Sequence, residues 1–198
     1  MSQIFDTEII LETPNLLVRP MQYKDIDGFR DIAFDKDIWK FNVTRIYDEN
    51  ELNDYVNKAL NDRKNNLRYP FTIVDKNTGN IAGSTSYGNI SEYDRRLEIG
   101  WTWLGRQFQG SGINKGCKYL LLNYAFEHLN YIRVEFKTDL LNQRSNKALQ
   151  KIGAVEEGIL RSHTLMHDGR RRDTVYYSIL QTEWQRLKTN VFSEFLRE

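Results

Sequence analysis

A cluster of four glycines between an alternating apolar segment and an amphipathic segment constrains the fold of this chain most. Gly105, Gly110, Gly112 and Gly116 fall within twelve positions, and Gly110 and Gly112 lie just before the amphipathic segment. Glycine lets the backbone approach a ligand closely, and the free N–H groups of a helix N-terminus favour an anion such as phosphate. The cluster therefore predicts a strand, a ligand-binding turn and a helix, in that order.

The residues around these glycines separate three kinds of phosphate loop. A nucleotide-hydrolase P-loop needs a lysine and a Ser or Thr directly after its second glycine, but Ser111 and Gly112 follow Gly110. The dinucleotide fingerprint needs a glycine where Lys115 stands. That fingerprint also follows the first strand of a βαβ unit, whereas this loop follows the fourth predicted strand. A third pattern, Gln or Arg, two residues, Gly, one residue, then Gly or Ala, fits Gln107–Gly112 in full. The alternative is a turn that binds nothing.

Hydrophobic periodicity predicts one α/β (α+β) domain over residues 1–198. Alternation predicts strands at 15–19 (an edge strand), at 69–90 (two strands joined at 77–80), at 96–104, at 131–139 and at 157–180 (a hairpin turning at 168–169). Helical spacing predicts helices at 23–39, 49–64, about 113–129, 142–154 and 181–197. In the strand at 96–104, we expect one face to carry Leu97, Ile99, Trp101 and Trp103 and the other to carry Glu98, Gly100 and Thr102.

Charge and cysteine content exclude several classes of protein. The formal net charge is +1, so no basic field favours nucleic acid or an anionic membrane as a partner. The single cysteine, Cys117, excludes an internal disulfide and fits a reducing cytoplasm. Neither a signal peptide nor a run of about 20 apolar residues is found. We expect a cytoplasmic protein without nucleic-acid or membrane partners.

A second motif lies at Asn142–Ala154, N-x-x-S-x-x-A-x-x-K-x-G-A. Asn142 is a good N-cap and Gly153 a good C-terminal stop. Ser145 shares the stripe of Leu149 and other apolar residues, so it faces the core or a cleft. The alternative is a serine that bonds to nearby backbone in the first helical turn.

Together these motifs resemble the GNAT (general N-acetyltransferase) superfamily. Residues 107–112 are similar to its pyrophosphate loop for acyl-coenzyme A. Residues 142–154 are similar to the helix after the fifth strand in ribosomal-protein alanine N-acetyltransferases and their relatives. The resemblance spans about residues 12–184. It implies a mixed, mostly antiparallel central sheet, flanked by helices and splayed between its fourth and fifth strands.

The resemblance also implies an N-acetyltransferase that moves an acetyl group from acetyl-coenzyme A to a primary amine by direct attack. In this branch the asparagine contacts the coenzyme arm and the serine lies near the sulfur, roles that fall on Asn142 and Ser145. Many members carry a tyrosine acid where this chain has Leu149, so Ser145, a water or the backbone would support the thiolate. The complete set implied for the coenzyme is Trp103, Leu104, Gln107, Gln109, Gly110, Ser111, Gly112, Ile113, Asn114, Asn142 and Ser145.

Acetyl transfer also needs a base, because most amines are protonated at neutral pH. Glu98 is the candidate, since it shares a predicted strand face with Gly100, which suggests a cleft. The alternative is a surface glutamate paired with Arg95 or Arg96. Trp39, Ser86 and Tyr87 are candidates for the acceptor side, although both aromatic residues could equally belong to the core.

The remaining sequence patterns give weaker indications of function. His163 and His167 lie in a predicted strand, and Asp168 is the one third ligand of suitable type that the sequence offers, so we expect no metal. The acceptor stays open between a protein N-terminus, a polyamine and a small-molecule amine. An exposed strand or the terminal helix could support a homodimer. The alternative function is an acyl-coenzyme-A-binding regulatory module without transfer activity.

Overall fold

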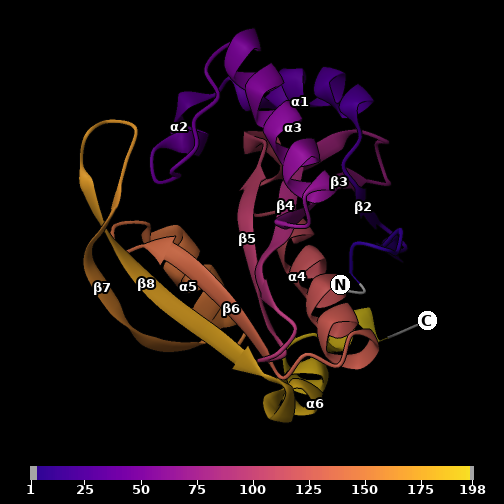
Figure 1. Cartoon of the computed structure of the whole chain (residues 1–198). Helices are drawn as coiled ribbons and strands as arrows, with labels where there is room; N and C mark the ends of the chain where they lie inside the picture. The colour runs from indigo at the N-terminus through magenta and orange to yellow at the C-terminus, as the bar shows by residue number, and fades with distance from the viewer. Residues whose placement is uncertain (1–3, 197–198) are drawn as a thin grey trace.

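A computed structural model describes residues 4–196 of the chain, whose strands form one eight-stranded sheet (Figure 1). The strand order is β1-β2-β3-β4-β5-β6-β8-β7, and every pair is antiparallel except β5 with β6. The strands are β1 (Leu11–Thr13), β2 (Leu16–Pro20), β3 (Arg68–Asp75), β4 (Ile81–Ser91), β5 (Arg96–Leu104), β6 (Arg133–Asp139), β7 (Val155–Leu165) and β8 (Arg171–Leu180). The predicted mixed, mostly antiparallel sheet is therefore confirmed.

Helices cover both faces of this sheet. They are α1 (Ile26–Ala33), α2 (Lys36–Trp39), α3 (Glu49–Lys64), α4 (Ile113–Asn123), α5 (Gln143–Lys151) and α6 (Gln181–Asn190), with short turns η1 (Tyr23–Asp25), η2 (Arg106–Phe108), η3 (Tyr124–His128) and η4 (Ser193–Phe195). Within residues 4–196, no helix is long and apolar enough to cross a bilayer.

Three predicted elements need correction. The strand at 15–19 is not an edge, because β1 pairs with its outer side. The helix at 23–39 is divided, since Asp35 is extended and its carboxylate caps α2 by accepting from the Asp37 N–H at 3.0 Å. The terminal helix ends at Asn190 and is followed by η4, while Arg197 lies outside the described residues.

Two tyrosines show which helix covers which face of β4. The Tyr55 hydroxyl of α3 donates to Ser84 Oγ at 3.1 Å, whereas the Tyr87 hydroxyl donates to the Leu121 carbonyl of α4 at 2.6 Å. Residues 84 and 87 point to opposite faces of a strand. The sheet thus has an α3 face and an α4 face.

The side-chain alternation of β5 is inverted at Trp101. Ser84 pairs with Trp103 and Ser86 with Gly100, so two residues of β5 stand opposite one residue of β4. Trp101 is the extra residue of this β-bulge and takes a φ of 52°. The prediction of one unbroken row is therefore wrong from Trp101 onward.

The inversion exchanges the faces of the residues beyond it. Trp103 lies on the α3 face, where its Nε1 donates to the Tyr55 hydroxyl at 3.0 Å. Thr102 lies on the α4 face, because Lys118 of α4 donates to its hydroxyl at 3.0 Å. Trp101 is 40% exposed.

The sheet is split between β5 and β6, the fourth and fifth predicted strands. They pair over three residues on each strand, Arg96–Glu98 with Arg133–Glu135, and then diverge as Figure 1 shows. Beyond Glu98, this edge of β5 has no strand partner in the described part of the chain. The predicted splay is confirmed.

β7 is the edge strand next to β8, and nearly all of its residues are exposed. Dimerisation through an exposed strand stays a prediction.

We expect Tyr87→Phe to lower the free energy of unfolding by about 1–2 kcal/mol, because it removes a buried hydrogen bond that joins α4 to the sheet. Urea denaturation followed by circular dichroism measures this. Tyr93→Phe is the control, since Tyr93 is 97% exposed and should unfold like the wild type. Equal stability of both variants would contradict the role of this bond.

Candidate active site

The glycine turn before α4 is open and its helix end is uncapped. Gly110 and Gly112 have φ values of 79° and 91°, a region that favours glycine. Among residues 4–196, a Cβ at either position would meet no atom within 4 Å apart from its chain neighbours. Gly112 is the N-cap of α4, and no side chain of the same range caps this helix end. These donors are therefore free for an anion.

Two arginines lie beside this turn, and Arg106 is paired with carboxylates, since its Nη1 lies 3.4 Å from both Asp35 Oδ2 and Asp37 Oδ2. Arg106 and Arg144 line a cavity of about 140 Å³ together with Asp35, Asp37, Ile38 and Gln109. Arg144 of α5 donates to Gln109 Oε1, so it connects α5 to the turn across the split. The sequence analysis missed both arginines, although each adjoins a motif residue and could have been found as a basic neighbour of a phosphate loop.

The first turn of α5 is built as its sequence predicts. The Asn142 Oδ1 accepts from the Ser145 N–H at 3.1 Å and caps the helix. Ser145 is partly exposed. The Arg144–Gln109 bond brings this turn to the glycine turn, so the structure places the two motifs side by side. The contacts that the resemblance implies for Asn142 and Ser145 stay predictions.

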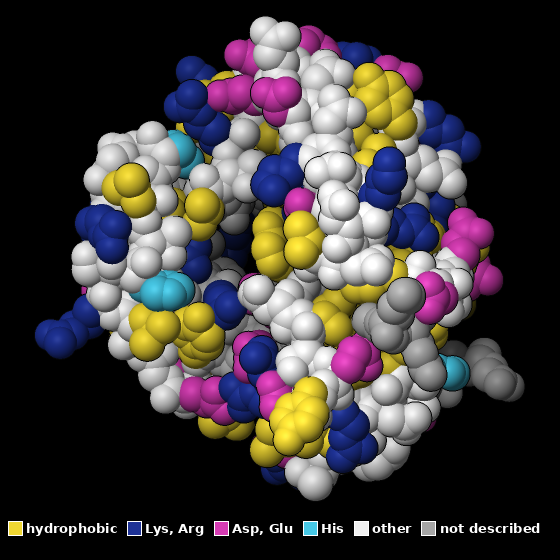
Figure 2. Space-filling view, in the orientation of Figure 1, with side chains coloured by type: hydrophobic (Ala, Val, Ile, Leu, Met, Phe, Trp, Pro, Cys, Tyr) yellow, Lys and Arg dark blue, Asp and Glu magenta, His cyan; other side chains and the backbone are white. Residues whose placement is uncertain are grey.

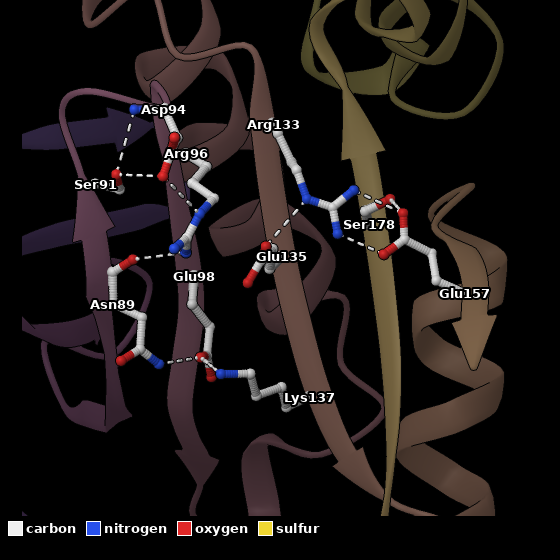
Figure 3. Close-up of polar contacts among 10 residues, drawn as sticks. All are labelled: Asn89, Ser91, Asp94, Arg96, Glu98, Arg133, Glu135, Lys137, Glu157 and Ser178. Atoms are coloured by element: carbon white, nitrogen blue, oxygen red, sulfur yellow. Dashed lines mark hydrogen bonds and ion pairs between the residues drawn. The ribbon is translucent and has the colours of Figure 1, made fainter. Parts of the chain in front are cut away.

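Glu98 lies at the point where β5 and β6 part, on the α3 face (Figure 3). Its carboxylate is buried, and its Oε2 accepts from Lys137 Nζ at 2.7 Å and from Asn89 Nδ2 at 2.6 Å. Burial alone would lower the pKa of Lys137, but the hydrogen bond and charge of Glu98 raise it above its ordinary value. The alternative of a surface glutamate paired with Arg95 or Arg96 is wrong.

The second oxygen of Glu98 remains available for chemistry. Both contacts of the carboxylate end on Oε2, whereas Oε1 lies over Gly100, where a Cβ would come within 2.5 Å of it. Since Gly100 has no side chain, it leaves room for this oxygen at the split. Oε1 is thus positioned to accept a proton.

A larger cavity opens next to Trp101 on the same face. Its volume is about 230 Å³, and it is lined by Thr44, Arg45, Glu51, Asp54, Tyr55, Lys58, Arg68 and Trp101. The Trp101 ring lies over Gly88, where a Cβ would approach it to 2.3 Å, and the Arg68 guanidinium lies 5.2 Å from the ring centroid. Figure 2 shows the hollowed centre of this face with hydrophobic and basic side chains at its rim.

The three residues predicted for the acceptor differ in their surroundings. The Trp39 ring is buried 5.1 Å from the Trp103 ring, and the Tyr87 ring is buried on the α4 face. Both belong to the core, so the prediction of an acceptor wall is corrected for these two residues. Ser86 is buried, and its Oγ has no hydrogen-bond partner in the part of the chain that the structure describes. A role for Ser86 stays a prediction.

Cysteine and histidine chemistry has no support at this site. Burial raises the pKa of the Cys117 thiol to about 12, so it is not a nucleophile. His163 contacts the Thr174 hydroxyl, while His167 contacts the Trp39 carbonyl, so the two rings face different neighbours. Over the described range 4–196, no three His, Cys, Asp or Glu side chains are grouped as a metal site.

Comparisons with known proteins agree with this arrangement. The family model described as an acetyltransferase (GNAT) domain matches residues 15–155. A Bacillus subtilis (strain 168) protein named "Putative ribosomal N-acetyltransferase YdaF" is 36% identical over 54% of this chain, and the match spans 57% of that relative's length. A Bacillus licheniformis protein named uncharacterized N-acetyltransferase p20 is 30% identical over 88% of this chain and 97% of its own.

A solved structure shows the likeness in three dimensions. A GCN5-related N-acetyltransferase from Brucella melitensis superposes with a TM-score of 0.87 at 24% identity, over 94% of this chain and 85% of its own. This agreement concerns the fold.

We expect Lys137→Met to destabilise the protein by roughly 2–3 kcal/mol at pH 7, because it leaves the Glu98 carboxylate buried without its counter-charge. Urea denaturation at pH 7 measures this.

The control is a double-mutant cycle. Glu98→Gln with Lys137→Met should be more stable than Lys137→Met alone, since no uncompensated charge remains. Strictly additive effects would show that the pair does not interact.

Proposed function

The chain belongs to the GNAT acetyltransferase family, and we propose that it moves an acetyl group from acetyl-coenzyme A to a primary amine by direct attack. The resemblance found in two motifs is thereby confirmed at the level of the family, and the protein is an acyltransferase. One observation carries the finer proposal: an open, uncapped glycine turn lies beside a split in the sheet, with Glu98 at the point where the strands part.

The residues present fit acetyl-coenzyme A, which supplies the thioester. The N–H groups around Gly112 and the Arg144 guanidinium offer donors and positive charge for its phosphates. Arg106 is paired with Asp35 and Asp37 and offers further donors only. The unpaired edge of β5 at Trp103 and Leu104 offers backbone groups for an amide-bearing arm. Because the Leu104 carbonyl accepts from Gln109 Nε2 at 3.0 Å, an arm that uses this carbonyl must displace Gln109.

Glu98 is proposed as the base for the amine. Lys137 and Asn89 hold its Oε2, so Oε1 takes the proton directly or through a water. The acetyl group passes straight to the amine, because the buried Cys117 thiol does not serve as an acyl carrier. In this proposal Ser145 supports the sulfur from α5.

The acceptor class proposed is the α-amine of a protein or peptide. An α-amine has a pKa of about 8 and a lysine amine of about 10.4, so far more of the former is neutral at pH 7. A relative is named as a ribosomal N-acetyltransferase, which supports a protein acceptor. The 230 Å³ cavity beside Trp101 offers room for the first side chain of such a peptide.

The experiment that tests coenzyme binding is a parallel thermal-shift titration with acetyl-coenzyme A, coenzyme A, ATP and NAD. Both coenzyme A species should stabilise the protein, and the two nucleotides should not. Arg144→Gln should weaken coenzyme A binding roughly 10- to 100-fold, the cost of a charge-assisted hydrogen bond. Lys147→Gln on the exposed side of α5 should bind normally.

No shift with either coenzyme A species would overturn the proposed ligand. Binding without turnover of any peptide, polyamine or drug amine would favour a regulatory module instead.

We expect Glu98→Gln to lower kcat/KM by about 10²- to 10⁴-fold, which is the usual contribution of a positioned general base to the rate. Its Kd for acetyl-coenzyme A should stay unchanged, because Glu98 lies at the split and away from the phosphate turn. Thiol release with a peptide acceptor measures the rate. Glu135→Gln is the control, since Glu135 stands opposite Glu98 in the register and is also paired with a basic residue, Arg133. An equal loss in both variants would contradict the role of Glu98.

A further inference from the structure

Lys118 of α4 is a buried lysine without a carboxylate partner. Its side chain is 5% exposed, and its Nζ donates to the Thr102 hydroxyl at 3.0 Å. Within residues 4–196, no ion pair includes it. A buried ammonium without a carboxylate counter-charge costs stability. The presence of a lysine at this buried position therefore needs a physical explanation.

The ammonium spans the split in the sheet. Thr102 belongs to β5, and the Phe136 ring, whose centroid lies 5.5 Å from Nζ, belongs to β6. Both side chains lie beyond the last residues at which these strands pair, Glu98 and Glu135. Lys118 is therefore located at the opening itself.

The opening has a different titratable group on each side. Glu98 lies on the α3 face and Lys118 on the α4 face, because the bulge at Trp101 turns Thr102 toward α4. The start of α5 is on the same side as Lys118, since Phe136 pairs with Tyr177, whose hydroxyl donates to Asn146.

The charges that face Lys118 leave it able to lose its proton. Burial lowers the pKa of Lys118 to about 8, and this outweighs the opposite effects of Cys117 on α4 and Glu98 on β5. Glu98 is itself neutralised by Lys137 on β6. A thiol has a pKa of about 8.5, so proton transfer between Lys118 and a thiolate would be nearly balanced.

Other proton donors on this side are less suited. The pKa of the Cys117 thiol is raised to about 12 by burial. The Tyr177 hydroxyl already bonds to Asn146 and Glu156. Ser145 offers an unactivated hydroxyl, and position 149 is a buried leucine.

Resting on the function proposed above, we propose that Lys118 is a catalytic residue that protonates the sulfur leaving the acyl donor. As the new C–N bond forms, the thioester C–S bond breaks and its electron pair goes to sulfur. The sulfur takes a proton from Lys118 Nζ. The neutral lysine then recovers a proton from solvent, and Glu98 releases the amine proton to solvent.

The first test compares coenzyme A with desulfo-coenzyme A, in which hydrogen replaces the thiol. By calorimetry at pH 8, the wild type should bind coenzyme A at least about 10-fold more tightly, because Lys118 and the sulfur share a proton in a charge-assisted hydrogen bond. Lys118→Met should lose this preference, whereas Lys147→Met should keep it.

The second test uses pH. In the wild type, kcat should fall as the pH rises through about 8, where Lys118 loses its proton, and Lys118→Met should be slower and lack this limb. The unfolded lysine keeps its proton to about 10.4, so wild-type stability should rise between pH 8 and 10 relative to Lys118→Met.

The outcomes separate the two proposals. If the wild type binds neither coenzyme, the proposed function fails. If it binds both equally at every pH, or if Lys118→Met keeps the preference, the role of Lys118 is overturned while coenzyme binding stands. The wild-type comparison decides the matter even if Lys118→Met does not fold.

Discussion

The β-bulge at Trp101 is the constraint on which the arrangement of the site depends. One extra residue in β5 inverts the alternation, so that Trp103 packs among the aromatic rings under α1 and α3 while Thr102 turns toward α4. It also presents the Trp101 ring to the cavity beside α3. Without it, residues 102 and 103 would exchange faces, and Lys118 would lose its hydrogen-bond partner.

The split between β5 and β6 then separates two opposite proton tasks. On one side, Glu98 pairs with Lys137 and accepts a hydrogen bond from Asn89 through the same oxygen, Oε2. On the other side, burial lowers the pKa of Lys118. The sheet keeps the acceptor and the donor apart, so their charges do not neutralise each other in a direct ion pair. A reaction that takes a proton from an amine and gives one to sulfur needs such a pair of groups.

Much of the fold and part of the candidate site could be predicted because they depend on local patterns. Turn residues at 168–169 and 77–80 specified the two hairpins, and the glycines at 110 and 112 do take positive φ values. Glu98 was found because it precedes the bulge, where alternation still holds. Trp39 and Tyr87 were assigned wrongly to the acceptor, since exposure depends on which elements cover a side chain.

Residue type and spacing are enough to predict the order of the elements, the open glycine turn, the cap of α5 and the family to which the chain belongs. The contacts across the split depend instead on the folded arrangement. Arg144 reaches the glycine turn from α5, Lys137 reaches Glu98 from β6, and Lys118 reaches Thr102 from α4. In the sequence these residues look like ordinary helical and strand cations. Their environments depend on contacts between distant segments and on one extra residue in a strand, which periodicity does not encode.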